Sequence, residues 1–223
     1  AQGHKGKGVR IDSGDIAYLS KKTRKMLDEA GLDYVKIVAS NSLDESIIRD
    51  LIMQGAQIDS FGVGERLITS KSEPVFGGVY KLSAVEENGK IIPKIKISEN
   101  VTKITNPSYK KVWRLFDNAS GKAVADVITL ADEVIDDSKP YTIFDPEQTY
   151  KKTTLTNFTA KPLQVKIFEK GKCIYNSPDI EEIKAYCKSQ LGTIWDEVKR
   201  FENPHEYYVD LSQPLWELKN RLL

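Results

Sequence analysis

Residues 34–64 predict a parallel β/α sheet; they read YVKIVASNSLDESIIRDLIMQGAQIDSFGVG. Residues 34–39 and residues 56–61 are rich in β-branched or apolar side chains and predict two strands. Between them, apolar residues at helical spacing predict a helix that Gly55 ends. Two strands joined by a helical crossover of this length pair in parallel, so this stretch decides the class of the fold.

The residues before this stretch repeat its plan. Residues 9–11 are a short apolar run, and residues 16–30 have helical spacing up to Gly31. The order strand, helix, strand, helix, strand predicts three parallel strands, either in an open doubly wound sheet or in a slice of a (β/α) barrel. Ser42, three residues before Glu45, matches a capping box and predicts where the second helix begins.

Each of the three predicted strands is followed by a polar or glycine-rich tripeptide. The three are Asp12-Ser13-Gly14, Ser40-Asn41-Ser42 and Gly62-Val63-Gly64. The carboxyl ends of parallel strands meet at one edge of a sheet, and chemistry sits at that edge in both candidate architectures. We therefore expect a functional site there.

The glycine tripeptide is the candidate for binding a phosphate. Gly62 and Gly64 flank Val63 between a strand and a helix, where backbone amides can approach an anion. Ser40 and Asn41 end the neighbouring strand and suit contacts to hydroxyl or phosphate groups. The alternative is that all five residues form ordinary tight connections between strands and helices.

Arg10 and Asp12 are the candidate catalytic residues. They lie on the same face of the first strand, on either side of an apolar residue. Asp12 can accept hydrogen bonds from ribose hydroxyls, and Arg10 can bind a carboxylate or a phosphate. The alternative is an internal ion pair, because charges in a parallel strand are costly unless they are used or paired. Asp15 is expected to be a helix N-cap.

After Pro74 the pattern changes to alternating strands, so we expect one part over residues 1–78 and a second over residues 79–223. Strands are predicted at 79–85, 91–97, 111–116, 124–128 and 163–168, an irregular region at about 130–160, and helices at 179 to about 200 and at 212–223. The expected class is α/β, with an antiparallel β-rich lobe and C-terminal helices following the parallel part.

The composition and the motifs exclude several classes of function. The net charge of +1 gives no overall field that favours nucleic acid or an anionic membrane. Cys173 and Cys187 are expected to be buried free thiols in a reducing, cytoplasmic setting. No zinc, Walker-A or Ser-His-Asp signature is present, so no metal ligand is predicted. Residues 1–8 are polar and glycine-rich and lack an initiator Met, which we interpret as a chain cut from a larger protein.

Together these segments resemble the nicotinate phosphoribosyltransferase family. The blocks that carry the resemblance are residues 8–15, 40–45, 55–64 and 77–82, and Ser212-Gln213-Pro214-Leu215 is similar to the family's tail. The order and spacing of the blocks make the match specific, strongly to about residue 83 and loosely beyond. The sequence departs from the family pattern at Ser42 and Glu65, where the resemblance implies Asp and Thr.

The resemblance implies the C-terminal portion of a type II phosphoribosyltransferase, with residues 1–78 as part of its α/β barrel. It implies a transferase and ligase of pyridine nucleotide biosynthesis that forms nicotinate mononucleotide from nicotinate and phosphoribosyl pyrophosphate in NAD salvage, coupled to ATP and Mg²⁺. It also implies a cytoplasmic homodimer. On this basis Asp12 holds the ribose hydroxyls, Arg10 faces the nicotinate carboxylate or a phosphate, and Gly62 and Gly64 present amides to the 5′-phosphate.

The same resemblance implies that an N-terminal portion, which carries a phosphorylated histidine and the residues that sandwich the pyridine ring, is absent. We therefore expect this chain to be inactive without that portion, which becomes its expected partner. Two alternatives stay open. One is a nicotinamide or quinolinate phosphoribosyltransferase of the same fold, and the other is a non-catalytic phosphate-binding module.

Overall fold

The structure of the chain is a computed structural model that describes residues 8–75, 77–100 and 103–223. The chain divides into two compact units, which we call unit 1 (Ala1–Val79) and unit 2 (Tyr80–Leu223). The sequence predicts a boundary after residue 78, and the roles given to the two parts stay predictions. Residues 1–7, expected to lead into the first strand, lie outside the described residues.

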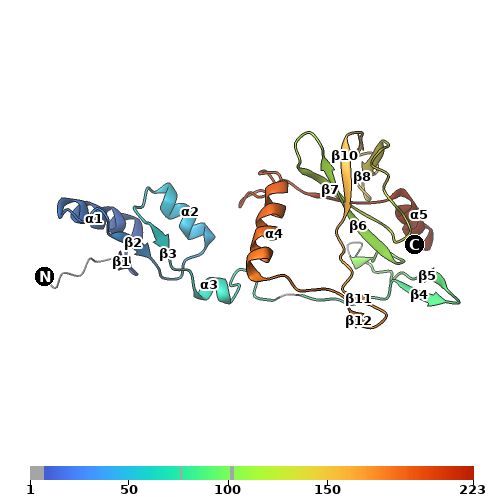
Figure 1. Ribbon diagram of the computed structural model, residues 1–223, viewed down its shortest axis with the longest axis horizontal. Coiled ribbons are helices and arrows are strands. Elements are labelled where there is room, and N and C mark those ends of the chain that lie inside the picture. The colour runs from blue at the N-terminus through green and yellow to red at the C-terminus, as the bar shows by residue number, and fades with distance from the viewer. Residues whose placement is uncertain (1–7, 76, 101–102) are drawn as a thin grey trace. The chain divides into compact units, whose positions relative to one another are not determined.

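Unit 1 is a parallel sheet with its helices in the crossovers (Figure 1). Its elements are β1 (Gly8–Ile11), α1 (Ile16–Glu29), β2 (Lys36–Ala39), α2 (Glu45–Met53), β3 (Ser60–Phe61) and α3 (Glu65–Ile68). The strand order is β1-β2-β3, and β2 pairs in parallel with both neighbours. The predicted alternation of parallel strands and helices is confirmed, and the described sheet is open, not a closed barrel.

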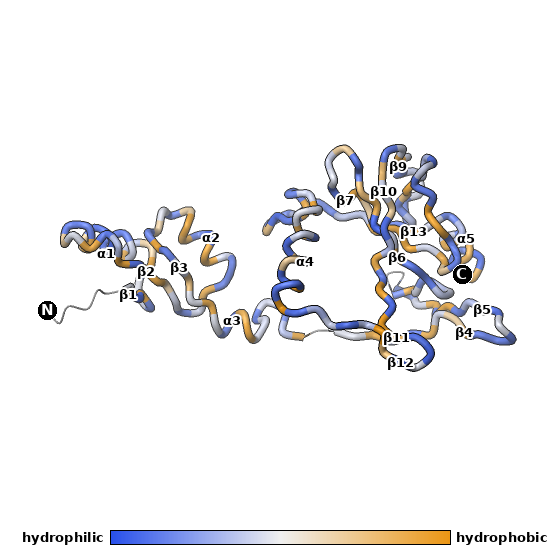
Figure 2. The backbone as a smooth tube through the Cα atoms, in the orientation of Figure 1, coloured by the Kyte–Doolittle hydropathy of each residue, from blue (hydrophilic) through white to orange (hydrophobic). Residues whose placement is uncertain are grey.

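The core of unit 1 lies between this sheet and its two longer helices. Ala17 of α1, Ala39 of β2, and Leu43 and Leu51 of the α2 region form a buried cluster. Figure 2 colours most of β2 toward the hydrophobic end, as expected for a central strand covered by helices. Asp15 caps α1 by accepting a hydrogen bond from the backbone N–H of Tyr18, so the predicted N-cap is confirmed.

Two local predictions for unit 1 are wrong. The third strand is shorter than the predicted 56–61, because the carboxylate of Asp59 accepts the backbone N–H of Ile37 at 2.8 Å, where a ladder bond from a strand residue would otherwise form. The capping box at Ser42 is also absent. The cap of α2 is Asp44, whose carboxylate accepts the N–H of Ile47.

Unit 2 is built mainly from antiparallel strands. Its elements are β4 (Ala84–Glu87), β5 (Lys90–Pro93), β6 (Lys110–Asp117), β7 (Ala123–Leu130), β8 (Tyr141–Phe144), β9 (Lys152–Leu155), β10 (Phe158–Pro162), β11 (Phe168–Glu169), β12 (Lys172–Cys173), α4 (Ile180–Thr193), β13 (Tyr208–Leu211) and α5 (Gln213–Leu222). Its largest sheet has the order β10-β6-β7-β13. β13, late in the chain, pairs in parallel with β7.

The core of unit 2 lies on one face of that sheet. Its buried members are Trp113, Leu115, Ala125, Val127, Ile135, Ile143 and Phe158. The last helix, α5, buries Leu215 and Leu218 and packs against β7. Ser212 caps it, as the predicted start of a helix at residue 212 requires.

Several predictions for unit 2 need correction. The strands predicted at 79–85 and 91–97 are the shorter β4 and β5, so the first begins later and the second ends earlier than predicted. Residues 131–140 hold no helix or strand, as predicted, but residues 141–160 are not irregular. There β8 and β9 form a hairpin with Pro146 in the turn between them, where a missing N–H costs nothing. Residues 163–167 are not a strand, because the side chain of Gln164 accepts the N–H of Val112 at 2.8 Å and ends the ladder after β10. The α4 helix ends at Thr193, not near residue 200.

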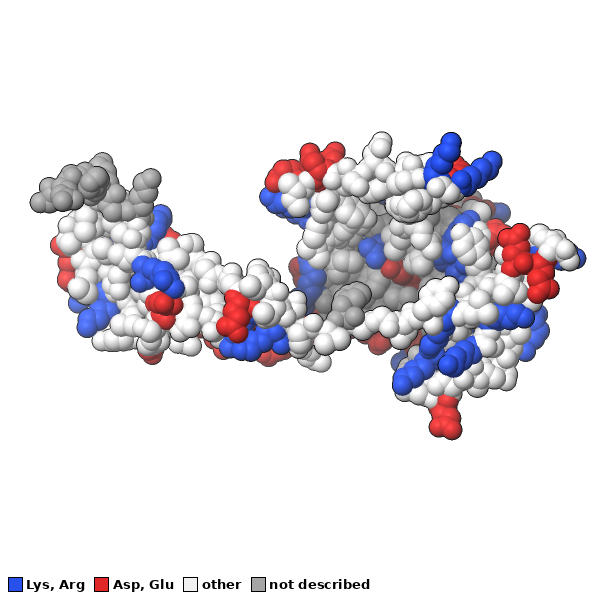
Figure 3. Space-filling view, turned by 90° about the horizontal axis from the view of Figure 1, so that it is seen from below, with Lys and Arg blue, Asp and Glu red and all other residues white. Residues whose placement is uncertain are grey.

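The chain's surface adds two findings. Cys173 and Cys187 are exposed, so the prediction of buried thiols is wrong. Figure 3 shows Lys and Arg side chains interspersed with Asp and Glu side chains on the visible face, in keeping with the net charge of +1. None of the helices in the described part of the chain combines the length and apolar character that a membrane crossing needs.

Candidate functional site

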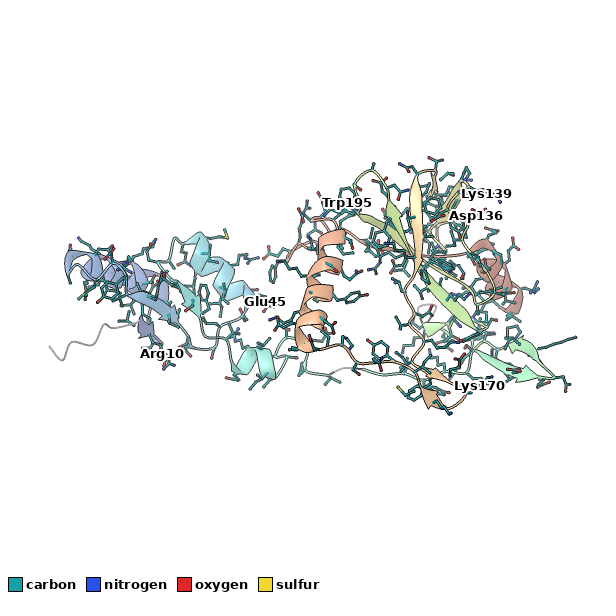
Figure 4. All side chains as sticks on the ribbon, viewed as in Figure 1. Arg10, Glu45, Asp136, Lys139, Lys170 and Trp195 are labelled. Atoms are coloured by element: carbon teal, nitrogen blue, oxygen red, sulfur yellow. The ribbon has the colours of Figure 1, made fainter. Side chains whose placement is uncertain are left out.

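The carboxyl ends of β1 and β2 bring Arg10, Asp12 and Ser40 together. The two strands pair in register, with Arg10 opposite Val38, and the N–H of Ser40 continues the ladder by donating to the carbonyl of Ile11 at 3.0 Å. Ser40 therefore follows β2 at the same level at which Asp12 follows β1. Figure 4 labels Arg10 on β1.

These three side chains form a closed hydrogen-bonded triangle. Arg10 Nε donates to Ser40 Oγ at 2.7 Å, and Ser40 Oγ donates to Asp12 Oδ1 at 3.2 Å. Arg10 Nη2 lies 3.0 Å from Asp12 Oδ2, and the two side chains are 63% and 51% exposed. An ion pair this exposed contributes about 0–1 kcal/mol to stability, so stability does not account for the arrangement. The ion pair offered by the sequence as the alternative is present, and it leaves both groups open to a ligand.

The backbone after Ser40 adopts an uncommon conformation. Asn41 and Ser42 have φ angles of 94° and 47°, in the left-handed region that non-glycine residues rarely occupy. Such conformations cost about 1–3 kcal/mol each and persist only where the surrounding structure enforces them. Here the next residue, Leu43, is fully buried and anchors the turn in the core.

The glycine tripeptide lies beside this triangle. The N–H of Gly62 donates to the carbonyl of Ala39 at 2.7 Å, which continues the β2–β3 ladder. A Cβ on Gly62 would stand 3.3 Å from the Cβ of Ser40, so glycine permits this close approach. Gly64 differs, because its φ is −130° and nothing lies within 4 Å of where its Cβ would be.

The amides that follow Gly62 are available to a ligand. Within the described residues, the backbone N–H groups of residues 63–66 donate to no protein acceptor. The first amides of α3 that are bonded are those of Leu67 and Ile68, which both donate to the carbonyl of Gly64. Because α3 has a single turn, its dipole adds little, and the amides themselves are the groups that could hold an anion.

An ion pair fastens the far side of the glycine turn. Arg66 Nη1 donates to Asp44 Oδ2, and these side chains are 28% and 23% exposed. The hydrogen bond from the N–H of Ile47, together with the Arg66 guanidinium, lowers the pKa of Asp44 below its ordinary value. Asp44, Val63 and Arg66 line one cavity with part of α2, and Figure 4 labels Glu45 at the start of that helix.

The chain is similar to known proteins of one family. Residues 109–219 match the model of the nicotinate phosphoribosyltransferase C-terminal domain. The chain is 48% identical over 212 residues to the nicotinate phosphoribosyltransferase of Bacillus subtilis, a match that covers 95% of the chain and 43% of that protein. The chain belongs to the nicotinate phosphoribosyltransferase family. It spans less than half the length of the curated relatives that it matches.

Solved structures of this family and of a related enzyme are similar in fold. The crystal structure of human nicotinic acid phosphoribosyltransferase matches with a TM-score of 0.73 and 27% identity, over 96% of this chain and 40% of that one. The nicotinate-nucleotide pyrophosphorylase from Pyrococcus furiosus matches with a TM-score of 0.55 and 25% identity, over 84% of this chain and 40% of that one.

Most of the candidate site residues that the sequence predicts lie at one edge of the unit 1 sheet. Arg10, Asp12, Ser40 and Gly62 meet there, while their roles toward a substrate stay predictions. Sequence reasoning missed the pair of Asp44 and Arg66. The signal that could have revealed this pair is the opposite charge of two residues near successive strand-to-helix connections, since such connections lie at the same edge of a parallel sheet.

No group of three or more His, Cys, Asp or Glu side chains within the described ranges is arranged to hold a metal ion. The described residues of this edge provide hydrogen-bond donors and acceptors, the guanidiniums of Arg10 and Arg66, and the carboxylates of Asp12 and Asp44.

Proposed function

We propose that this chain forms the ribose-phosphate-binding edge of a nicotinate phosphoribosyltransferase, which makes nicotinate mononucleotide and pyrophosphate from nicotinate and phosphoribosyl pyrophosphate. The observation that carries the proposal is the Arg10–Asp12–Ser40 triangle standing against Gly62 at the carboxyl ends of three parallel strands. Membership in the family supports nicotinate over nicotinamide or quinolinate as the pyridine.

Each residue receives a role that its geometry allows. The carboxylate of Asp12 accepts hydrogen bonds from the ribose hydroxyls, with Ser40 and Asn41 beside it. The free amides that follow Gly62 donate to the 5′-phosphate. Arg10, already 3.0 Å from Asp12, neutralises a carboxylate or a phosphate of the substrate.

This arrangement suits the chemistry of phosphoribosyl transfer. The reaction passes through a centre with oxocarbenium character, so a protein accelerates it chiefly by orienting the ribose and by placing charge around it. An edge that holds the hydroxyls from one side and the 5′-phosphate from the other fixes the ribose between two anchors. The pyridine and the pyrophosphate are then the groups that move.

The proposed enzyme also has features that lie outside the described residues. We infer that the unit 1 sheet is part of a type II α/β barrel, because β1 and β3 are the outer strands of a three-stranded sheet and offer open edges that further strands would cover. The proposal also includes coupling to ATP with Mg²⁺, a homodimer and a cytoplasmic setting, as in the sequence-based expectation. Because the chain spans 43% of its Bacillus subtilis relative, we expect the 223 residues to need further polypeptide for turnover.

Binding of ribose 5-phosphate to the natural enzyme that contains this chain tests the phosphate part of this proposal. In a ¹⁵N amide NMR titration we expect the signals of residues 63–66 to shift most. Gly62→Val should abolish binding, because its Cβ meets Ser40 at 3.3 Å and forces the turn away. Gly192→Ala is the control, since Gly192 lies in the α4 helix of unit 2 and its Cβ would have open space, and it should bind with an affinity close to that of the original chain. Equal binding by both variants would contradict the proposed cradle.

Asp12 tests the catalytic part in the natural enzyme that contains this chain. Asp12→Asn should lower kcat by about 100-fold or more, because an oriented ribose is the main contribution expected of it. The melting temperature should barely change, since an exposed ion pair contributes little. Asp33→Asn, on the exposed surface before β2, is the control. A large fall in melting temperature with normal kcat would mean that Asp12 only pairs with Arg10. If the natural enzyme without any substitution forms no nicotinate mononucleotide, the alternative of a non-catalytic phosphate-binding module is favoured.

A further inference from the structure

The first clue to a further role is the ion pair between two strand-to-helix connections of unit 1. Arg66 belongs to α3, directly after the glycine turn, and Asp44 is the N-cap of α2. One carboxylate oxygen of Asp44 accepts the N–H of Ile47 at 2.9 Å, and the other accepts Arg66 Nη1. A single carboxylate therefore starts α2 and holds α3 at the same time.

The α3 helix needs such a contact because it has little stability of its own. It spans only four residues, and its N-cap, Gly64, provides no side-chain hydrogen bond. Helix formation is cooperative, so one isolated turn is not stable in water. Across the described residues 63–73, every other hydrogen bond stays within that segment. The Arg66–Asp44 contact is thus the polar link from this segment to the rest of unit 1.

A second clue is the Nε atom of Arg66. It is buried and has no hydrogen-bond partner in the described part of the chain. Leaving a buried donor unpaired costs about 1–3 kcal/mol. The guanidinium is therefore held against Asp44 although its Nε atom makes no hydrogen bond there. This is expected of a side chain whose role is to position the turn.

We propose that Arg66 and Asp44 are positioning residues that hold the turn at residues 62–66 against Ser40 and Asp12. The inference rests on the proposed function, because the turn matters only if its amides bind the ribose phosphate. Neither residue needs to touch the substrate. Without the pair, α3 loses its polar link to α2, and the free amides are no longer held in one orientation next to Gly62.

Because Gly62 lies so close to Ser40, the turn at residues 62–66 must be held in a fixed position. One side of the turn is set by the 2.7 Å bond from Gly62 to the carbonyl of Ala39. Among the described residues, the hydrogen bond that fastens the other side is the one from Arg66 to Asp44. A turn fastened at both sides presents its amides in one orientation, whereas a turn fastened at one side samples many orientations and pays an ordering cost when it binds an anion.

Two substitutions separate positioning from folding. Asp44→Asn keeps a side-chain oxygen that can cap α2 but removes the charge that holds Arg66. Arg66→Met keeps the aliphatic stem of the side chain and removes the guanidinium. Asp28→Asn is the matched control, because Asp28 accepts from Arg24 at 2.8 Å within α1, away from the site.

The measurements are made on the natural enzyme that contains this chain, and they are ¹⁵N amide NMR without ligand and a titration with ribose 5-phosphate. We expect Asp44→Asn and Arg66→Met to move the ligand-free signals of residues 63–66 toward random-coil values and to weaken binding by about tenfold. Asp28→Asn should change neither. The melting temperature of each variant is also measured, and we expect its change not to follow the change in affinity.

The outcomes distinguish this inference from the function on which it rests. If the original chain binds ribose 5-phosphate and both site variants bind it within twofold, the positioning role is wrong and the phosphate site stands. If the original chain does not bind, the phosphate site is wrong, and the ligand-free signals still decide whether the pair fixes the turn. Unchanged ligand-free signals in both site variants overturn the inference in either case.

Discussion

The buried carboxyl of Asp210 predicts that unit 2 becomes less stable as the pH rises through about 6. Asp210 lies on β13 with 4% of its surface exposed, and no hydrogen bond to its carboxyl is found among the described residues. Burial, and secondarily the nearby charge of Asp145, raises the pKa of Asp210 from 3.8 to about 6. Asp145 and Asp210 line one cavity together with Lys151, Lys152 and His205.

The sign and size of the effect follow from linkage. The folded chain binds the proton of Asp210 more tightly than the unfolded chain, so this group favours folding most at a pH below about 4. That advantage falls as the pH rises and is lost above about 6. A difference of about two pH units corresponds to about 3 kcal/mol. Because the carboxyl borders a cavity that water can enter, we expect about 2 kcal/mol.

Asp210→Asn tests this reasoning because the amide is nearly isosteric and never ionises. At pH 7.5 we expect the variant to be more stable than the original chain by about 2 kcal/mol, and at pH 4 the two should be nearly equal. Urea unfolding followed by tryptophan fluorescence measures the difference, since all three tryptophans (Trp113, Trp195 and Trp216) lie in unit 2. The same stability difference at both pH values, or a less stable variant at pH 7.5, would refute the argument.

Asp136 provides a control of opposite sign. Lys139 and Ser138 lower the pKa of this exposed carboxyl to about 2. Its ionised form therefore favours the folded chain, and that contribution is present above the unfolded pKa and is lost as the pH falls toward 2. Asp136→Asn should make the chain slightly less stable at pH 7.5, not more. Figure 4 labels Asp136 and Lys139 in unit 2.

Three further changes test contacts elsewhere in the chain. Arg114→Met should cost about 3 kcal/mol in urea unfolding, because it leaves the partly buried Asp126 carboxylate without its two-bond partner, and adding Asp126→Asn should recover part of the loss. Ser212→Ala should cost about 1–2 kcal/mol by the same assay, since its hydroxyl caps α5 and donates to a carboxylate at 2.7 Å. Asp59→Ala should increase amide hydrogen exchange in β2 by about tenfold, because it removes the acceptor of a β2 amide and the partner of Lys36; unchanged exchange would contradict that role.

The candidate site was predictable from the sequence in position but not in detail. Polar residues at the ends of alternating strands located the edge at which Arg10, Asp12 and Ser40 meet. The bonds among these side chains depend on strand register, which sequence spacing does not specify. The link from Arg66 to Asp44 depends on how two neighbouring connections turn, and it too was missed.

The sequence by itself determined the elements with local causes. The period of apolar residues set the helices and parallel strands of unit 1, and an Asn-Gly pair set the β4–β5 hairpin, where Asn88 and Gly89 both have positive φ angles. Each of these signals acts within a few residues, so it can be read without knowing what packs against it.

Only the tertiary structure decided where strands end and which distant segments pair. Side chains of Asp59 and Gln164 take amides that strand residues would otherwise have bonded, and so they shorten two predicted strands. β13 joins β7 across about 80 residues of chain, a pairing that no local pattern encodes. The physical reason is that long-range pairing is chosen by burial and hydrogen-bond competition in the folded chain, where contacts between distant residues outweigh local preference.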